Sequence, residues 1–150
     1  MTDEPRHRTP IQVRFRDTDA FGHVNNAVFF TYIELARVRY LVDVLQLKEP
    51  FERMPLILAR VELDFRSPIM FGEDVEVTTQ VDRIGRSSIA MSHRLTAGPE
   101  RRLVGESESV LVTYDYAAAR PIPVPDEWRR TIVAHEGRPL EETAPTVAAG

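Results

Sequence analysis

One long helical pattern, which starts at Asn26, constrains the fold more than any other stretch of this sequence. Apolar residues recur there at three- and four-residue steps, the spacing of one face of an α-helix. The members of this pattern are Ala27, Phe30, Ile33, Ala36, Tyr40, Leu41 and Val44, and further apolar residues are Phe29, Tyr32, Leu35, Val38 and Leu45. A helix that is apolar nearly all round is buried on several sides. The rest of the chain therefore has to enclose it.

Alternating apolar and polar residues predict five β-strands, one before the helix and four after it. The predicted strands are Ile11 to Arg16, Leu56 to Arg66, Glu73 to Arg83, Ser88 to Thr96 and Leu103 to Tyr114. Short turn-like connections at 84–86 and 97–100 predict antiparallel hairpins between neighbouring strands. The order strand, helix, four strands predicts an α+β fold in which one antiparallel sheet buries the helix.

The composition changes after Tyr116, which suggests a boundary. We expect a domain of residues 1–117, whose residues 1–9 form a loose lead-in, and a C-terminal extension of residues 118–150. In the extension, 117–125 is rich in Ala and Pro, and a short amphipathic helix is predicted near 126–136 around Trp128 and Ile132. From Gly137 onward we expect a flexible tail.

Charge and residue usage argue against several classes of function. The net charge of −4 offers no general attraction to nucleic acid or to an anionic membrane, so neither is expected as a partner. Cysteine is absent, so disulfides and a cysteine nucleophile are excluded. No run of about 18 apolar residues exists to span a bilayer. The start of the chain has no apolar core typical of a signal peptide, and the cytoplasm is the expected compartment.

Candidate catalytic groups lie in the stretch from Arg16 to Asn26, between the first strand and the helix. A carboxylate such as Asp19 can serve as nucleophile or general base. Asn25 suits the N-cap position. The first-turn N–H groups near Asn26 have no partner inside the helix, and the helix dipole adds partial positive charge there. This combination fits acyl transfer, although Asp-rich turns before helices also occur with a purely structural role.

Other polar residues leave two interpretations open. His23 can orient a substrate or can be an ordinary loop histidine. Ser87 and Ser88 can bind an extended ligand or can simply close a hairpin. The remaining histidines, His7, His93 and His135, lie on separate segments without metal-ligand spacing, so no metal site is expected.

The segment Arg16-Asp17-Thr18-Asp19-Ala20-Phe21-Gly22-His23-Val24-Asn25-Asn26, followed by Tyr32, Glu34, Ala36 and Arg37, resembles the signature of hotdog-fold acyl-CoA thioesterases of the 4-hydroxybenzoyl-CoA thioesterase type. The resemblance covers roughly residues 10–116. It implies a five-stranded antiparallel sheet wrapped around one long central helix. It also implies a homodimer paired edge to edge with active sites at the subunit interface, and often a homotetramer.

The resemblance also implies roles for particular residues. Asp19 matches the catalytic aspartate, which attacks the thioester carbonyl or activates water, and Asn26 matches the residue whose backbone amide polarises that carbonyl. His23 belongs to the Gly-His-Val-Asn-Asn variant of the motif, and Asp17 supports the loop. The positions that would contact the pantetheine arm and nucleotide of coenzyme A (CoA) are Arg83, Arg86, Ser87 and Ser88. No cofactor is implied, because CoA is part of the substrate.

The leading hypothesis is hydrolysis of an acyl-CoA thioester to a carboxylic acid and free CoA. A hotdog dehydratase or hydratase acting on acyl thioesters is a second reading, and a CoA-ester-binding module without activity is a third. Phe21, Phe29, Phe30, Met54 and Leu58 suggest an apolar acyl pocket, while core packing explains them equally well. The acyl group, and the choice between CoA and acyl carrier protein as its carrier, stay open.

Overall fold

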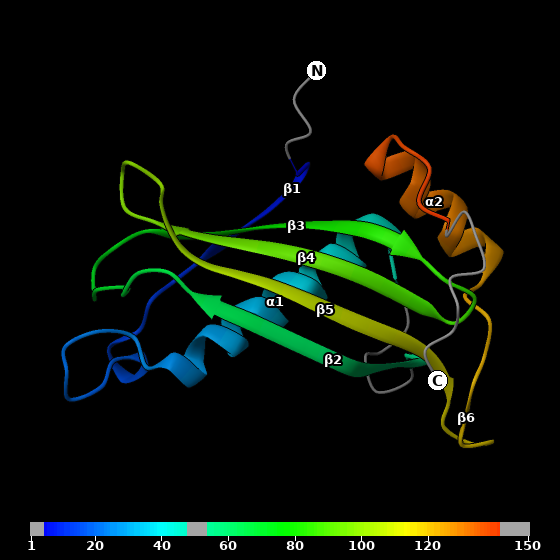
Figure 1. Ribbon diagram of the computed structural model, residues 1–150, viewed down its shortest axis with the longest axis horizontal. Coiled ribbons are helices and arrows are strands. Elements are labelled where there is room, and N and C mark those ends of the chain that lie inside the picture. Colours follow the sequence, from blue (N-terminus) through cyan, green and yellow to red (C-terminus); the bar gives the residue numbers. More distant parts are fainter. Residues whose placement is uncertain (1–4, 48–53, 142–150) are drawn as a thin grey trace.

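A six-stranded antiparallel sheet and one long helix across it form the body of the protein (Figure 1). The structure is a computed structural model and describes residues 5–47 and 54–141. Its elements in chain order are β1 (His7–Ile11), the 3-10 turn η1 (Phe15–Asp17), α1 (Asn26–Leu45), β2 (Leu56–Phe65), β3 (Val75–Ile84), β4 (Ser88–Ala97), β5 (Arg102–Asp115), β6 (Arg120–Pro121) and α2 (Asp126–Glu136). The strand order is β1-β3-β4-β5-β2, with β6 paired to β5. The predicted hotdog architecture and its antiparallel hairpins are confirmed.

The long helix begins where the sequence predicts. The Asn25 side chain accepts a hydrogen bond of 2.8 Å from the Ala27 N–H, which satisfies one free amide of the first turn. At the other end, Gln46 takes a left-handed conformation with φ of 50° and stops the helix. Its buried side chains include Phe29, Ile33 and Tyr40, which pack into the core. α1 is therefore a central packing element that also presents its N-terminal turn at one end of the sheet.

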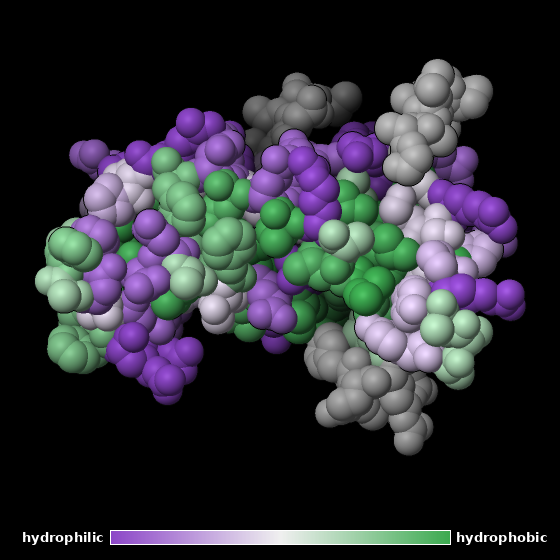
Figure 2. Space-filling view, turned by 60° about the horizontal axis from the view of Figure 1, so that its bottom comes forward, coloured by the Kyte–Doolittle hydropathy of each residue, from purple (hydrophilic) through white to green (hydrophobic). Residues whose placement is uncertain are grey.

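The inner face of the sheet is only half covered by α1. Side chains of β3 alternate between buried and partly buried, as expected for a covered strand, whereas most of β2 is exposed. Among the inward-facing residues of β2, Leu58 is 41% exposed and Phe65 is 45% exposed. Figure 2 shows the hydrophobic surface on this side of the molecule. A single chain thus leaves apolar area open beside α1 and along the β2 edge.

The first strand differs from the prediction. It runs from His7 to Ile11, not from Ile11 to Arg16, and pairs antiparallel with β3. Its buried positions are His7, Thr9 and Ile11, so two of its three inward side chains are polar. Because these side chains are polar, residues 7–9 show no apolar alternation and were predicted to be a loose lead-in. Phe15, which falls within the predicted strand, is 79% exposed and belongs to η1.

The C-terminal region packs against the sheet and α1. Helix α2 spans the predicted residues, and Tyr40 of α1 donates a hydrogen bond of 2.6 Å to the Glu136 carboxylate. The expected flexible tail from Gly137 is wrong for residues 137–141. Leu140 is buried there, and its carbonyl accepts a hydrogen bond of 2.7 Å from the Ile84 N–H. The remainder of the predicted tail, 142–150, lies outside the described residues.

A buried polar row crosses the inner face of the sheet. The two ring nitrogens of His93 hydrogen-bond to the hydroxyls of Thr79 (3.0 Å) and Ser109 (3.1 Å), which ties three neighbouring strands together. Burial, with a smaller contribution from the charge of Arg37, lowers the pKa of His93 to about 3. The ring is therefore neutral in the folded protein at physiological pH.

The lowered pKa of His93 predicts that the folded protein becomes less stable in acid. In the unfolded chain His93 regains a pKa of about 6.5, so below that pH the unfolded state binds the additional proton and the free energy of unfolding falls as pH drops toward 3. His93→Gln should flatten this dependence. Urea unfolding at a series of pH values measures it, and identical pH slopes for the variant and the parent would contradict the assignment.

Candidate active site

The loop that precedes α1 is anchored by the buried Asp17. Its carboxylate accepts hydrogen bonds from the Arg14 N–H (2.9 Å) and from the Tyr32 hydroxyl (2.8 Å), and its carbonyl accepts from the Asn25 N–H (2.9 Å). Burial, followed by the hydrogen bond to Asp17, raises the pKa of Tyr32. The same residue therefore fixes both ends of the loop and its contact with α1. Asp17 supports the loop, as the resemblance implies.

Removing this anchor should destabilise the protein. We expect Asp17→Ala to lower the free energy of unfolding by about 1–3 kcal/mol, because the buried Tyr32 hydroxyl and the Arg14 amide lose their acceptor. Tyr32→Phe removes one of these bonds and leaves no donor unsatisfied, so its loss should be smaller. Chemical denaturation of both variants measures the difference. Equal stability of Asp17→Ala and the parent would show that the loop is held by other contacts.

Asp19 is held in place but keeps a free carboxylate oxygen. Its Oδ1 accepts a hydrogen bond of 2.9 Å from the Phe21 N–H and lies 3.9 Å from His23 Nδ1. Within the part of the chain that the structure describes, its Oδ2 has no hydrogen-bond partner. The side chain is 23% exposed. Asp19 is thus oriented through one oxygen, while the other remains available for chemistry.

A cavity of about 270 Å³ lies beside the start of α1. It is lined by His23, Val24, Asn26, Phe29, Phe65, Arg66, Ser67 and Pro68. Among residues 5–47 and 54–141, no acceptor binds the Asn26 N–H, so this amide is a free donor at the positive end of the helix dipole. Asp19 does not line the cavity itself and adjoins it through His23. Phe65 to Pro68 were missed as site residues, because the sequence marks them only as the end of a strand.

The other predicted contacts lie elsewhere in the chain. Arg83, Arg86, Ser87 and Ser88 belong to the turn between β3 and β4 or to its flanking strands. This turn and the start of α1 are at opposite ends of the sheet (Figure 1). One chain therefore brings Asp19, His23 and Asn26 together and does not bring the β3–β4 turn to them.

A second hollow of about 430 Å³ opens between α1 and β2. Its lining is Glu34, Arg37, Val38, Leu41, Met54, Leu56, Leu58, Leu111 and Tyr116. Arg37 is only 7% exposed, and burial lowers its pKa while nearby Glu34 opposes that shift. In the described part of the chain Arg37 makes no hydrogen bond or ion pair. The nitrogens of Arg37 are not among the buried side-chain atoms that lack a partner, so the guanidinium reaches the hollow that it lines.

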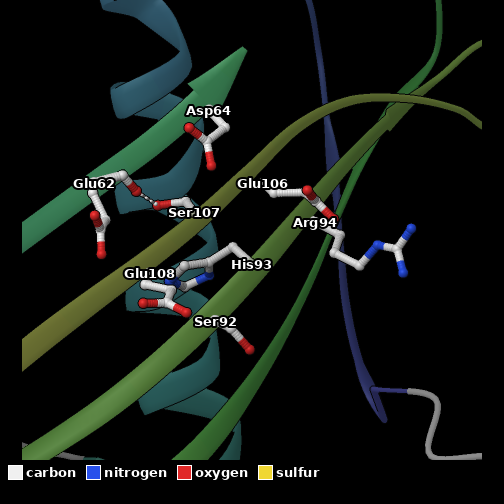
Figure 3. Close-up of a pocket in the computed structure, with 8 residues that line it drawn as sticks. All are labelled: Glu62, Asp64, Ser92, His93, Arg94, Glu106, Ser107 and Glu108. Carbon is white, nitrogen blue, oxygen red and sulfur yellow. Dashed lines mark hydrogen bonds between the residues drawn. The ribbon is translucent and has the colours of Figure 1, made fainter. Parts of the chain in front are cut away.

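A third hollow lies on the opposite face of the sheet, away from α1 (Figure 3). Residues of β2, β4 and β5 line it, namely Glu62, Asp64, Ser92, His93, Arg94, Glu106, Ser107 and Glu108. The Ser107 hydroxyl donates a 2.8 Å hydrogen bond to the Glu62 carbonyl, which joins β5 to β2. None of the predicted site residues belongs to this hollow. Among the described residues, no group of three or more His, Asp or Glu side chains is placed to hold a metal ion.

Comparison with known proteins agrees with this geometry. A family model described as the thioesterase-like superfamily matches residues 13–132. A solved thioesterase from Thermus thermophilus, complexed with coenzyme A and Zn, is 41% identical with a TM-score of 0.82, covering 93% of this chain and all of the other (100%).

Two curated relatives come from Escherichia coli. The long-chain acyl-CoA thioesterase FadM of strain K12 is 24% identical over 83% of this chain and 96% of its own length. The acyl-CoA thioester hydrolase YbgC of strain O6:H1 is 25% identical over 79% of this chain and 89% of its own. The resemblance drawn from the loop and helix is thereby confirmed. The chain belongs to the thioesterase-like superfamily and is a thioester hydrolase with a hotdog fold.

Proposed function

We propose that this enzyme hydrolyses an acyl-CoA thioester to a carboxylic acid and free CoA, with Asp19 as the reacting carboxylate. The proposal rests on two groups near His23, each of which lacks a hydrogen-bond partner in the described residues. Asp19 offers a free carboxylate oxygen on one side, and the Asn26 N–H is a free donor in the cavity on the other. An acyl carbonyl needs both a nucleophile and a donor where its negative charge develops.

In this mechanism Asp19 acts by one of two routes. Its oxygen attacks the carbonyl carbon and the CoA thiolate leaves, after which water hydrolyses the resulting anhydride. In the other route Asp19 removes a proton from a water molecule that attacks directly. In both, the Asn26 N–H donates to the carbonyl oxygen as it becomes negative, with the helix dipole adding to the stabilisation. His23, 3.9 Å from Asp19, orients the carboxylate or the substrate.

A homodimer is the proposed minimal unit, and dimers can assemble further into a homotetramer. Three features favour a second copy along β2: the exposed edge strand, its apolar inner face including Leu58 and Phe65, and the hollow beside it that Arg37 and Glu34 line. The β3–β4 turn can bind the CoA end of a substrate only if it lies near the loop before α1. Within one chain the two are at opposite ends of the sheet (Figure 1), so the turn has to come from a second chain. An antiparallel pair of chains places the partner's turn toward the loop of the first chain.

The apolar hollow between α1 and β2 is the proposed acyl site, because Met54, Leu56, Leu58 and Leu111 line it. No cofactor is proposed beyond the CoA of the substrate, and the cytoplasm stays the expected compartment. None of the described helices is long and apolar enough to cross a membrane.

A thiol-release assay across a panel of aromatic, short-chain and long-chain acyl-CoA esters tests the proposal. We expect release of free CoA from at least one member of the panel. Loss of the conjugated enoyl-thioester absorbance without thiol release would favour the dehydratase or hydratase. A higher melting temperature with CoA esters, again without thiol release, would favour a binding module.

A further inference from the structure

The turn between β3 and β4 is held from outside the hairpin by one arginine of α2. Arg129 Nη2 donates hydrogen bonds to the carbonyls of Gly85 (2.6 Å) and Arg86 (3.0 Å), and its Nε donates to the Val124 carbonyl at 3.4 Å. The side chain is only 19% exposed. A planar guanidinium with several fixed donors suits this bridging role better than an ammonium group. Arg129 therefore joins the C-terminal extension to the turn.

Neighbouring segments engage the remaining carbonyls of the turn. The Arg86 carbonyl also accepts from the Val124 N–H at 2.8 Å, and the Ser87 carbonyl accepts from the Thr113 N–H at 2.9 Å. Every carbonyl from 85 to 87 is thus bound to protein donors. In the described residues, by contrast, the N–H groups of Arg86 and Ser87 donate to nothing. The turn is therefore held through its carbonyl groups, while the N–H groups of Arg86 and Ser87 have no acceptor in the described residues.

Free backbone donors beside an exposed cation suit an anionic ligand. The Arg86 side chain is exposed, and Ser87 is half-buried next to it. A phosphate or an amide carbonyl of CoA could accept from these N–H groups only if the turn keeps its present orientation. If the carbonyls were released, the peptide planes of the turn could rotate, and the N–H groups of Arg86 and Ser87 would rotate with them.

We propose that Arg129 is a positioning residue for CoA: it holds the β3–β4 turn so that the N–H groups of Arg86 and Ser87, with the Arg86 side chain, can bind the carrier end of the substrate. This inference rests on the proposed function, in which that turn contacts CoA. It assigns a role to the C-terminal extension, which carries no part of the recognised loop-helix motif. Arg129 acts through the turn and does not touch the reacting carbonyl.

The test compares Arg129→Ala with Arg130→Ala, which removes the same charge from an exposed neighbour on α2. Calorimetry with CoA alone should give a Kd raised about tenfold by Arg129→Ala and unchanged by Arg130→Ala. In the hydrolysis assay, Arg129→Ala should raise KM for acyl-CoA with kcat within about twofold. The N-acetylcysteamine ester of the same acid, which lacks the nucleotide, should be hydrolysed equally by all three proteins.

Several outcomes would overturn the positioning role. One is an unchanged CoA affinity in Arg129→Ala, and another is an equal loss on both thioesters, which indicates a general structural defect. If Arg129→Ala does not fold, Arg129→Lys serves instead, and it should fold and show an intermediate Kd because one ammonium cannot hold the same three carbonyls. Failure of the proposed function looks different: the parent then releases no thiol from either thioester, while the CoA affinities still report on the turn.

Discussion

Asp19→Asn is expected to lower kcat by about 10²–10⁴-fold, the range typical for loss of a positioned acid–base group. Asparagine has nearly the same shape, and its amide oxygen can still accept from the Phe21 N–H, which Asp19 Oδ1 does now. The second oxygen, which has no partner in the described residues, is replaced by an NH₂ group that can neither attack a carbonyl nor accept a proton. Steady-state thiol release measures the loss.

The control for this variant is Asp17→Asn, two residues away in the same loop. That side chain is buried, and its carboxylate bonds Tyr32 and Arg14 without reaching the cavity. We expect Asp17→Asn to affect stability more than the chemical step, and Asp19→Asn to show the reverse. Full activity of Asp19→Asn would show that another group performs the chemistry.

Leu58→Asp is expected to produce a monomer and to lower kcat/KM by about 10²-fold or more, because a carboxylate would be buried without a partner in the proposed interface. Leu58 is 41% exposed in the single chain and lines the hollow between α1 and β2. Losing the partner would also remove the turn that we propose to bind CoA. Sedimentation and the thiol-release assay measure the two effects together.

Ile57→Asp is a matched control. Ile57 is the adjacent residue of β2 with the same 41% exposure, but it pairs with Val112 and so faces the other side of the sheet. We expect this variant to remain dimeric and active. A monomer from both substitutions would indicate that any charge on β2 disrupts the strand, and a Leu58→Asp dimer would contradict the proposed interface.

The central helix could be predicted closely because its evidence is local. Apolar spacing and the Asn25 cap lie within the segment itself, and both its start and its burial follow from them. The first strand was misplaced because its inward residues His7 and Thr9 are polar, and hydrophobic alternation detects only apolar faces. Whether a polar face of a strand is buried depends on what packs against it, and the strand's own sequence does not show this.

The other site residues that the sequence did not predict depend on contacts between distant segments. The order Asp17, Asp19, His23, Asn26 identifies the loop, but the bond from Tyr32 to Asp17 and the placement of Phe65 to Pro68 beside it depend on tertiary packing. Arg129 looks like an ordinary polar residue of an amphipathic helix until it is seen to reach a carbonyl 44 residues away. Such long-range roles leave no periodic signal in the chain.

In the proposed enzyme, the Asp19 carboxylate of one chain works with the β3–β4 turn of another. Within one chain, the start of α1 and the β3–β4 turn lie at opposite ends of the sheet (Figure 1). Asp19→Asn removes the reacting group, and Arg86→Glu reverses the charge that would meet the CoA phosphates. Each homodimer should therefore have low kcat/KM for acyl-CoA.

The decisive measurement is kcat/KM of a heterodimer that combines one Asp19→Asn chain with one Arg86→Glu chain, co-expressed with different tags and purified through both. One of its two sites then has an intact Asp19 facing an intact Arg86. We predict about half of the parent kcat/KM per dimer, since one of two sites works. If the heterodimer is no more active than the Asp19→Asn and Arg86→Glu homodimers, Asp19 and Arg86 do not act together across the interface.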